Sequence, residues 1–112
     1  MIATDTSTRA FRRAAARFLS MPGVGEGTGF GSSAGLRVRG KIFAFVSRDG
    51  ELVVKLPKAR VDSLVASGAG TRFDPGHGRV MKEWIAVVTG RSRSWPSLMD
   101  EARTYVERGS SR

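Results

Sequence analysis

The segment between residues 34 and 56 constrains the fold of this chain more than any other part of the sequence. Its apolar side chains alternate with a period of two in three short runs, AGLRV, KIFAFVS and ELVVKL. Arg39-Gly40 separates the first two runs, and Arg48-Asp49-Gly50 separates the second from the third. A polar residue followed by glycine is typical of tight hairpin turns. The pattern therefore predicts three antiparallel strands, near residues 35–38, 41–47 and 51–56.

The middle run, KIFAFVS, is apolar on both of its expected faces. In a regular strand Ile42, Ala44 and Val46 point one way, and Phe43 and Phe45 point the other way. Strands that are apolar on both faces lie in the middle of a sheet, so we expect both faces of this strand to be covered. A further strand of the same sheet is predicted at WIAVV, residues 84–88, with Trp84 anchoring it in the core.

Three other segments have the period of amphipathic helices. The first covers about residues 5–21, with Phe11 and Phe18 on the apolar side and arginines opposite. The second begins at Pro57 and ends at Gly68, and the third follows Ser94, which we expect to cap it. The glycine-rich residues 23–35 predict a mobile strand or loop, and GRSRS, residues 90–94, an exposed basic loop.

The resulting element order, α-β-β-β-α-β-α, predicts an α+β domain in which helices cover an antiparallel sheet. A chain of 112 residues is long enough for one core, so residues 1–112 are expected to form one domain, with about 1–5 and 109–112 frayed. The residues expected to be mostly buried are Phe43, Phe45, Val54, Leu64, Trp84, Ile85 and Leu98.

Composition narrows the function classes. The absence of cysteine excludes a disulfide framework, a thiol nucleophile and a cysteine-type zinc site. The first residues lack the apolar stretch of a secretory signal, and the longest aliphatic and aromatic run is only IFAFV at 42–46. We therefore expect a cytoplasmic protein, monomeric or weakly dimeric, with no cofactor, no bound metal and no membrane partner.

Three short motifs match catalytic patterns in letters but not in context. GLRVRGKI, residues 35–42, resembles a phosphate-binding loop, but Ile42 stands where a magnesium-binding Ser or Thr is needed and no helix follows. GFGSSA, residues 29–34, has the glycine spacing of a dinucleotide fingerprint, again before strands and not before a helix. GSSAG places Ser33 in a hydrolase-like elbow, with Asp62 or Asp74 and then His77, but that elbow needs a long parallel sheet.

The only histidine also has a structural interpretation. His77 lies between Gly76 and Gly78, with no second histidine or cysteine to share a metal, as in an exposed connecting loop. Lys82 and Glu83 are neighbours at the entry to a strand, where they point to opposite faces. We therefore predict that the protein is not an enzyme.

The charge balance favours a polyanionic partner. Lys and Arg number 19 against 10 Asp and Glu, which gives a net charge of +9. Helical spacing places Arg9, Arg13 and Arg17 in one row, with Arg12 beside it. The residues predicted to contact DNA are Arg9, Arg12, Arg13, Arg17, Arg39, Lys41 and Arg48. Two alternatives stay open: a basic face that is merely solvated, and a protein-interaction or small-ligand domain that uses the glycine-rich segment and the groove it borders.

Several stretches carry a family resemblance. LSMPGVGEGTGFGSSAGLRVRGKIFAFV, LVVKLPKARVDSLVASG and FDPGHGRVMKEWIAV resemble the YjbR/MmcQ-like family and the related TfoX N-terminal domain, over roughly residues 8–108. The most specific pieces are the V-x-G-K-x-F-A element of residues 38–44 and the F-D-P-G to M-K-E-W run of residues 73–84. The resemblance implies a CyaY-like α+β fold with helices on one side of the sheet, also described as a double-wing DNA-binding fold. It implies no catalytic residues.

Overall fold

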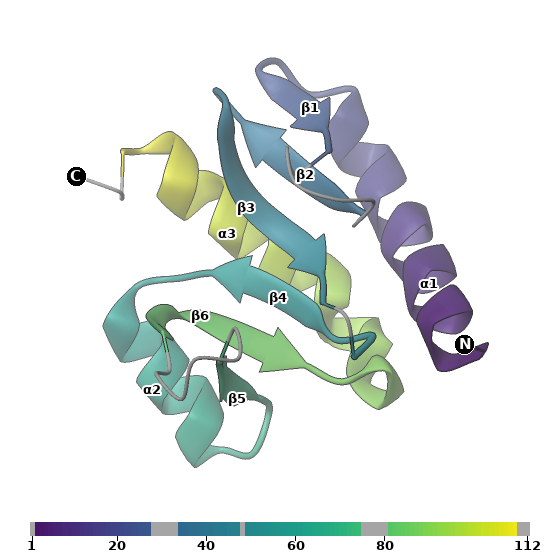
Figure 1. Cartoon of the computed structure of the whole chain (residues 1–112). Coiled ribbons are helices and arrows are strands. Elements are labelled where there is room, and N and C mark those ends of the chain that lie inside the picture. The colour runs from purple at the N-terminus through teal and green to yellow at the C-terminus, as the bar shows by residue number, and fades with distance from the viewer. Residues whose placement is uncertain (1, 28–33, 48, 75–80, 110–112) are drawn as a thin grey trace.

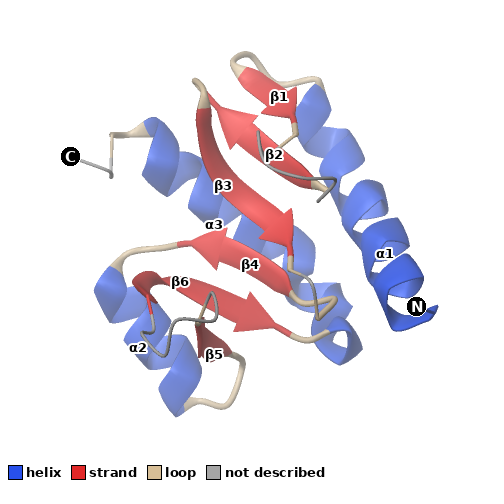
Figure 2. Ribbon diagram, viewed as in Figure 1, coloured by secondary structure: helices blue, strands red, loops and turns tan. Residues whose placement is uncertain are grey.

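The protein is a sheet with three helices packed against one of its faces (Figures 1 and 2). The computed structural model describes residues 2–27, 34–47, 49–74 and 81–109. The elements in chain order are α1 (Ile2–Leu19), β1 (Val24–Glu26), β2 (Gly35–Val38), β3 (Lys41–Val46), β4 (Leu52–Lys55), α2 (Lys58–Ala66), β5 (Thr71–Phe73), β6 (Met81–Val87), the 3-10 helix η1 (Thr89–Ser94) and α3 (Trp95–Glu107).

The six strands form one sheet in the order β1-β2-β3-β4-β6-β5, and every neighbouring pair is antiparallel. This confirms the α+β class and the four predicted strands, with β3 near the middle. The two edge strands, β1 and β5, are three residues long. β1 lies in the glycine-rich segment, and β5 has no counterpart among the strands expected from the sequence. Edge strands this short contain too few alternating side chains to give a recognisable period.

Both predicted hairpins are present. Arg39 and Gly40 have φ of 52° and 82°, as a two-residue turn with two left-handed positions requires, and they place Val38 opposite Lys41. The second turn closes with a hydrogen bond from the Gly50 N–H to the Ser47 carbonyl, with Gly50 at φ 81°. Arg48 lies outside the described residues.

The three helices share one core with the inner face of the sheet. α1 contributes Phe11 and Phe18, α2 contributes Val61 and Leu64, and α3 contributes a stripe that includes the fully buried Trp95. The predicted helices are confirmed, and Ser94 stands at the N-cap position of α3, but its side chain makes no capping hydrogen bond. Its hydroxyl donates to the Arg91 carbonyl instead, because the expected basic loop is itself a turn of 3-10 helix, η1.

The predicted face assignment of β3 is wrong at its first half. Leu36 pairs with Ala44 and Arg37 pairs with Ile42, so Phe43 is an extra residue with no partner on β2. This bulge lets Phe43 turn inward, where its ring meets Phe18 edge-on with the ring centroids 6.2 Å apart. Phe43 and Ala44 are therefore both in the core, although the period of two predicted opposite faces.

Phe45 and Trp84 are only partly exposed, but the expectation that Trp84 lies in the core is corrected. Phe45 and Trp84 are half-buried on the outer face, which the helices do not cover, with their ring centroids 5.9 Å apart. Trp84 pairs across the ladder with Lys55, while its neighbour Ile85 takes the inward position and is fully buried. The other predicted core residues are buried: Phe43, Val54, Leu64, Ile85 and Leu98.

A basic face on the first helix as the candidate functional site

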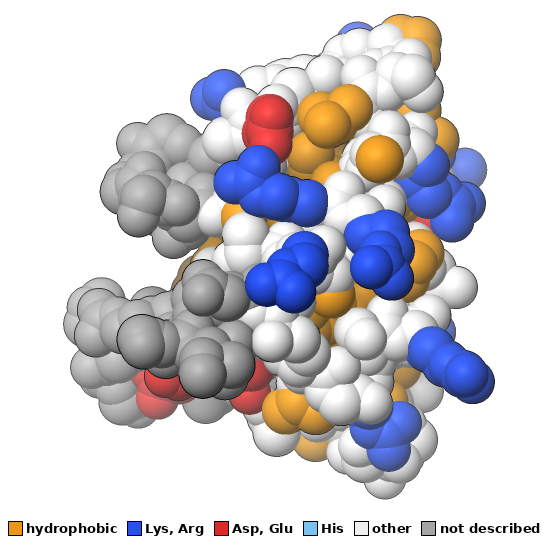
Figure 3. All heavy atoms as spheres, turned by 90° about the vertical axis from the view of Figure 1, so that its right-hand side faces the viewer, with side chains coloured by type: hydrophobic (Ala, Val, Ile, Leu, Met, Phe, Trp, Pro, Cys, Tyr) orange, Lys and Arg blue, Asp and Glu red, His pale blue; other side chains and the backbone are white. Residues whose placement is uncertain are grey.

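The solvent side of α1 carries the predicted arginine row. Arg9, Arg13 and Arg17 are all exposed, while Phe11 and Phe18 of the same helix are buried. Their spacing of four residues brings successive arginines to within about 6 Å of one another along the helix axis. In Figure 3, which looks onto the α1 side of the molecule, Lys and Arg side chains are spread along most of the visible surface.

Carboxylates are distributed very unevenly over the described residues. Arg60 holds Glu101 with two hydrogen bonds of 2.9 and 3.0 Å, and Asp62 pairs with Lys58 and Arg72. These pairs lie on α2, α3 and β5, away from α1. Among the described side chains, neither Arg9 nor Arg13 has an ion pair. Among the described side chains of α1, only Arg12 has an ion pair.

The other two arginines of α1 make weak contacts. Arg12 lies 3.8 Å from Glu26, and both side chains are more than half exposed, at 64% and 59%. Such a surface pair contributes at most about 1 kcal/mol, so it leaves Arg12 available to another anion. The guanidinium carbon of Arg17 lies 5.4 Å from the centroid of the Phe18 ring, which orients the side chain without neutralising it.

The hairpin residues of the predicted interface lie apart from one another. The β2–β3 turn lies at one end of β3 and the β3–β4 turn at the other end. A strand of six residues spans about 20 Å. Arg39 donates its backbone N–H to Gly23, just beyond the end of α1, and its guanidinium lies 3.7 Å from Glu107. Lys41 follows the same turn, and Arg48 belongs to the opposite turn and lies outside the described residues. The two turns therefore lie about one strand length apart.

Two further exposed arginines, which are not among the residues predicted to contact DNA, lie on η1. Arg91 and Arg93 are exposed on η1, and neither has an ion pair within the described part of the chain. η1 lies against the first half of α1, where the hydroxyls of Ser7 and Thr89 are hydrogen bonded. The signal was present in the sequence as the basic run GRSRS, but only the packing of η1 on α1 relates it to the arginine row.

The catalytic alternatives gain no support from the described residues. Residues 35–42 form β2, a tight turn and the start of β3, which is not the loop and helix of a phosphate-binding loop. Asp62 is held by Lys58 and Arg72, and these hydrogen bonds keep the pKa of its carboxyl below the ordinary value. Ser33 and His77 lie outside the described residues, as do residues 29–33 of the GFGSSA segment. Asp74 is exposed, Lys82 is exposed on β6, and Glu83 accepts a hydrogen bond from the Tyr105 hydroxyl.

Within the described ranges, no group of three His, Cys, Asp or Glu side chains could hold a metal ion. No helix in that part of the chain combines the length and the apolar character needed to cross a bilayer.

The fold and its surface define a small, strongly basic α+β domain with helices on one face of an antiparallel sheet. The chain matches the model of the YjbR family over residues 19–105, more than half of its length, and it therefore belongs to the YjbR family. This confirms the YjbR resemblance. No curated protein and no solved structure matches the chain. The arginine row of α1 precedes the matched residues, so the family match says nothing about it.

Proposed function

We propose that this domain binds duplex DNA weakly and without strong sequence preference, through the arginine row of α1. The observation that carries the proposal is the row itself: Arg9, Arg13 and Arg17 are exposed, and no ion pair with a described carboxylate compensates them. The domain would act by binding and would carry out no reaction.

The arginine row does not stabilise the helix, so helix stability does not explain why it is there. Like charges four residues apart destabilise a helix by about 0.2–0.5 kcal/mol for each pair, and the row contains two such pairs. Phosphates bound along the helix would remove this repulsion. The spacing of about 6 Å along the helix is close to the phosphate spacing along one DNA strand, so neighbouring arginines can each meet a phosphate. Contacts of this kind position a protein on DNA but do not read its sequence.

The number of contacts sets the expected strength. Arg9, Arg13 and Arg17, with Arg12 and one arginine of η1, offer roughly three to five phosphate contacts, which gives a log–log salt slope of about −3 to −5. The corresponding affinity is micromolar or weaker at physiological salt.

Fluorescence anisotropy with a labelled duplex tests the proposal. The variant Arg9→Gln, Arg13→Gln, Arg17→Gln is compared with a control, Lys58→Gln, Lys82→Gln, Arg108→Gln, whose three cations are also exposed but lie on α2, β6 and the end of α3. Both variants lower the net charge equally, from +9 by 3 to +6. Glutamine keeps a helix propensity close to that of arginine.

The α1 variant should reduce the magnitude of the salt slope by about three units and weaken binding to every duplex alike. The control should change the slope by less than one unit. An equal effect of the two variants would mean that only net charge matters. Absence of binding by the unmodified protein at tens of micromolar and low salt would leave the row as a solvated face.

A further inference from the structure

A cleft opens where the sheet divides between β3 and β4. β3 pairs with β4 only from Ala44 to Val46. The first residues of β3 instead follow β2, and the end of β4 follows β6, where Lys55 pairs with Trp84 and the Leu56 N–H donates to the Glu83 backbone carbonyl. The two halves of the sheet therefore separate at this end, as Figure 1 shows, and α3 passes behind the gap.

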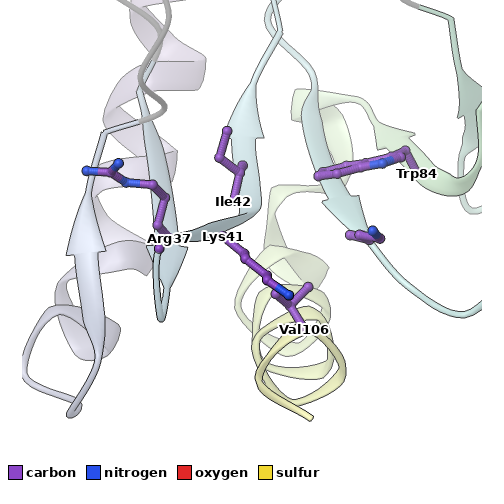
Figure 4. Close-up of a pocket in the computed structure, with 7 residues that line it drawn as sticks. Arg37, Lys41, Ile42, Trp84 and Val106 are labelled. Carbon is purple, nitrogen blue, oxygen red and sulfur yellow. The ribbon is translucent and has the colours of Figure 1, made fainter. Parts of the chain in front are cut away.

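The cleft has a volume of about 380 Å³, within the range of small-ligand sites. Val106 of α3 lies at its base, and Ile42 and Trp84 face it from the two halves of the sheet (Figure 4). Lys41 and Lys55 line it together with Arg37. Its lining thus holds three cations and, among the described residues, no carboxylate, while the Glu83 carboxylate lies 3.9 Å from the Lys55 ammonium.

Lys55 is the most constrained of these cations. Its side chain is only 16% exposed, its ammonium lies 5.8 Å from the centroid of the Trp84 ring, and Glu83 is 3.9 Å away. The ammonium is thus fixed beside an aromatic ring by packing before any ligand arrives. Lys41 extends toward Val106, whereas the guanidinium of Arg37 points away from Lys41 (Figure 4). Lys41 and Lys55 are therefore the cations placed to meet an anion within the cleft.

An apolar hollow adjoins the cleft on the outer face of the sheet. It has a volume of about 250 Å³ and is lined by Ile42, Phe45, Phe73, Met81 and Trp84. Ile42 and Trp84 therefore border both spaces. Each of the other three is at least partly exposed, and the rings of Phe45 and Phe73 meet edge-on at 5.6 Å. Aromatic surface next to a fixed ammonium suits a ligand that is apolar at one end and anionic at the other.

We propose that this cleft binds a small ligand in which a flat aromatic ring is joined to a phosphate or a carboxylate. The ring lies against Trp84 and Ile42, and the anionic group binds between Lys41 and Lys55. Neither lysine belongs to α1, so this site is independent of DNA binding by the arginine row, and each proposal can fail without the other.

The two tryptophans of the chain give a direct readout. Trp84 borders the cleft and is half-buried, whereas Trp95 is fully buried in the core. In a ¹⁵N–¹H spectrum each indole N–H gives one signal, and Trp84→Phe identifies which is which. The probes are adenosine monophosphate and indole-3-acetate, which combine a ring with a phosphate or a carboxylate, and adenosine and inorganic phosphate, which each supply one part.

At least one of the combined probes should shift the Trp84 signal, leave the Trp95 signal in place and bind at least tenfold more tightly than either adenosine or phosphate. A comparison of the two combined probes identifies the preferred anion. The proposal is overturned if neither binds, or if a separate part binds as tightly as the combined probe.

Substitutions separate the anion contact from a general effect of charge. Lys55→Gln and Lys41→Gln should each weaken the combined probe about tenfold or more and leave any weak binding of adenosine unchanged. Lys58→Gln removes the same charge from an exposed position on α2 that does not line the cleft, and it should have no effect on the probe. Equal weakening by Lys58→Gln and Lys55→Gln would refute a specific site in the cleft.

Discussion

The substitution Gly70→Ala tests whether the edge strand β5 depends on close backbone contact with β6. A Cβ atom at Gly70 would lie 2.7 Å from the Ala86 carbonyl oxygen and 2.9 Å from the Ile85 Cγ1 atom. The carbonyl belongs to the ladder, where Ala86 pairs with both Thr71 and Val53, and Ile85 is fully buried. Neither neighbour can move without disturbing the sheet or the core, so Gly70→Ala must displace the start of β5.

The magnitude follows from two opposing terms. Overpacking at a site of this kind typically costs about 1–3 kcal/mol. Alanine also restricts the unfolded chain, which favours the folded state by about 0.4–1 kcal/mol. We therefore expect Gly70→Ala to lower the free energy of unfolding by about 1–2 kcal/mol, and Tm by about 4–8 °C for each kcal/mol in a domain near this size.

Gly25 provides the matched control, because it also lies in an edge strand. A Cβ atom there would meet nothing within 4 Å, and its φ is not in the left-handed region. Gly25→Ala should therefore raise the free energy of unfolding by about 0.4–1 kcal/mol, the opposite sign. Urea unfolding followed by far-UV circular dichroism measures both. If Gly70→Ala proves as stable as Gly25→Ala, β5 does not pack on β6 as described.

Three further predictions concern charged groups. A double-mutant cycle on Arg60 and Glu101, both about 40% exposed, should give a coupling energy of about 0.5–1 kcal/mol in thermal unfolding. A coupling energy of zero would mean that this ion pair does not link α2 to α3. Burial is the main cause that raises the pKa of Glu51 above 4.5, and the charge of Asp49 is the second cause. Ionisation of Glu51 therefore lowers the stability of the fold as pH rises. Glu51→Gln should be more stable than the natural chain at pH 7 and equal to it near pH 3. The pKa of Asp62 is below 3.8, chiefly through its hydrogen bond to Lys58, so Asp62→Asn should lower Tm at pH 7, and the difference should disappear as pH falls below that pKa.

The sequence predicts those parts of the fold that local rules determine. The hairpin at Arg39-Gly40 and the helix end at Gly68 each need left-handed φ values of 52° to 82°, and glycine makes such positions visible in the sequence. Helix α1 is predictable because its apolar and charged sides separate cleanly. β5 and the bulge at Phe43 are not predictable in this way, because each depends on the register of a partner strand that is remote or offset.

The candidate site was predictable only in part. The row on α1 follows from helical spacing alone, so Arg9, Arg13 and Arg17 could be found without a structure. The relation of Arg91 and Arg93 to that row depends on tertiary packing, which joins Thr89 to Ser7 across the chain. The net charge does not show where on the surface the charged side chains lie, since the same +9 would result if the carboxylates were spread evenly.

The bulge that makes the predicted face assignment of β3 wrong also accounts for the cleft. A bulge bends its strand and increases the local twist. Pairing between β3 and β4 starts at Ala44, the residue directly after Phe43, and Ile42, directly before it, faces the cleft instead. One extra residue in β3 thus turns Phe43 into the core and directs the start of the strand away from β4. Lys41 and Lys55 consequently line an open space, where a continuous ladder would otherwise place backbone hydrogen bonds.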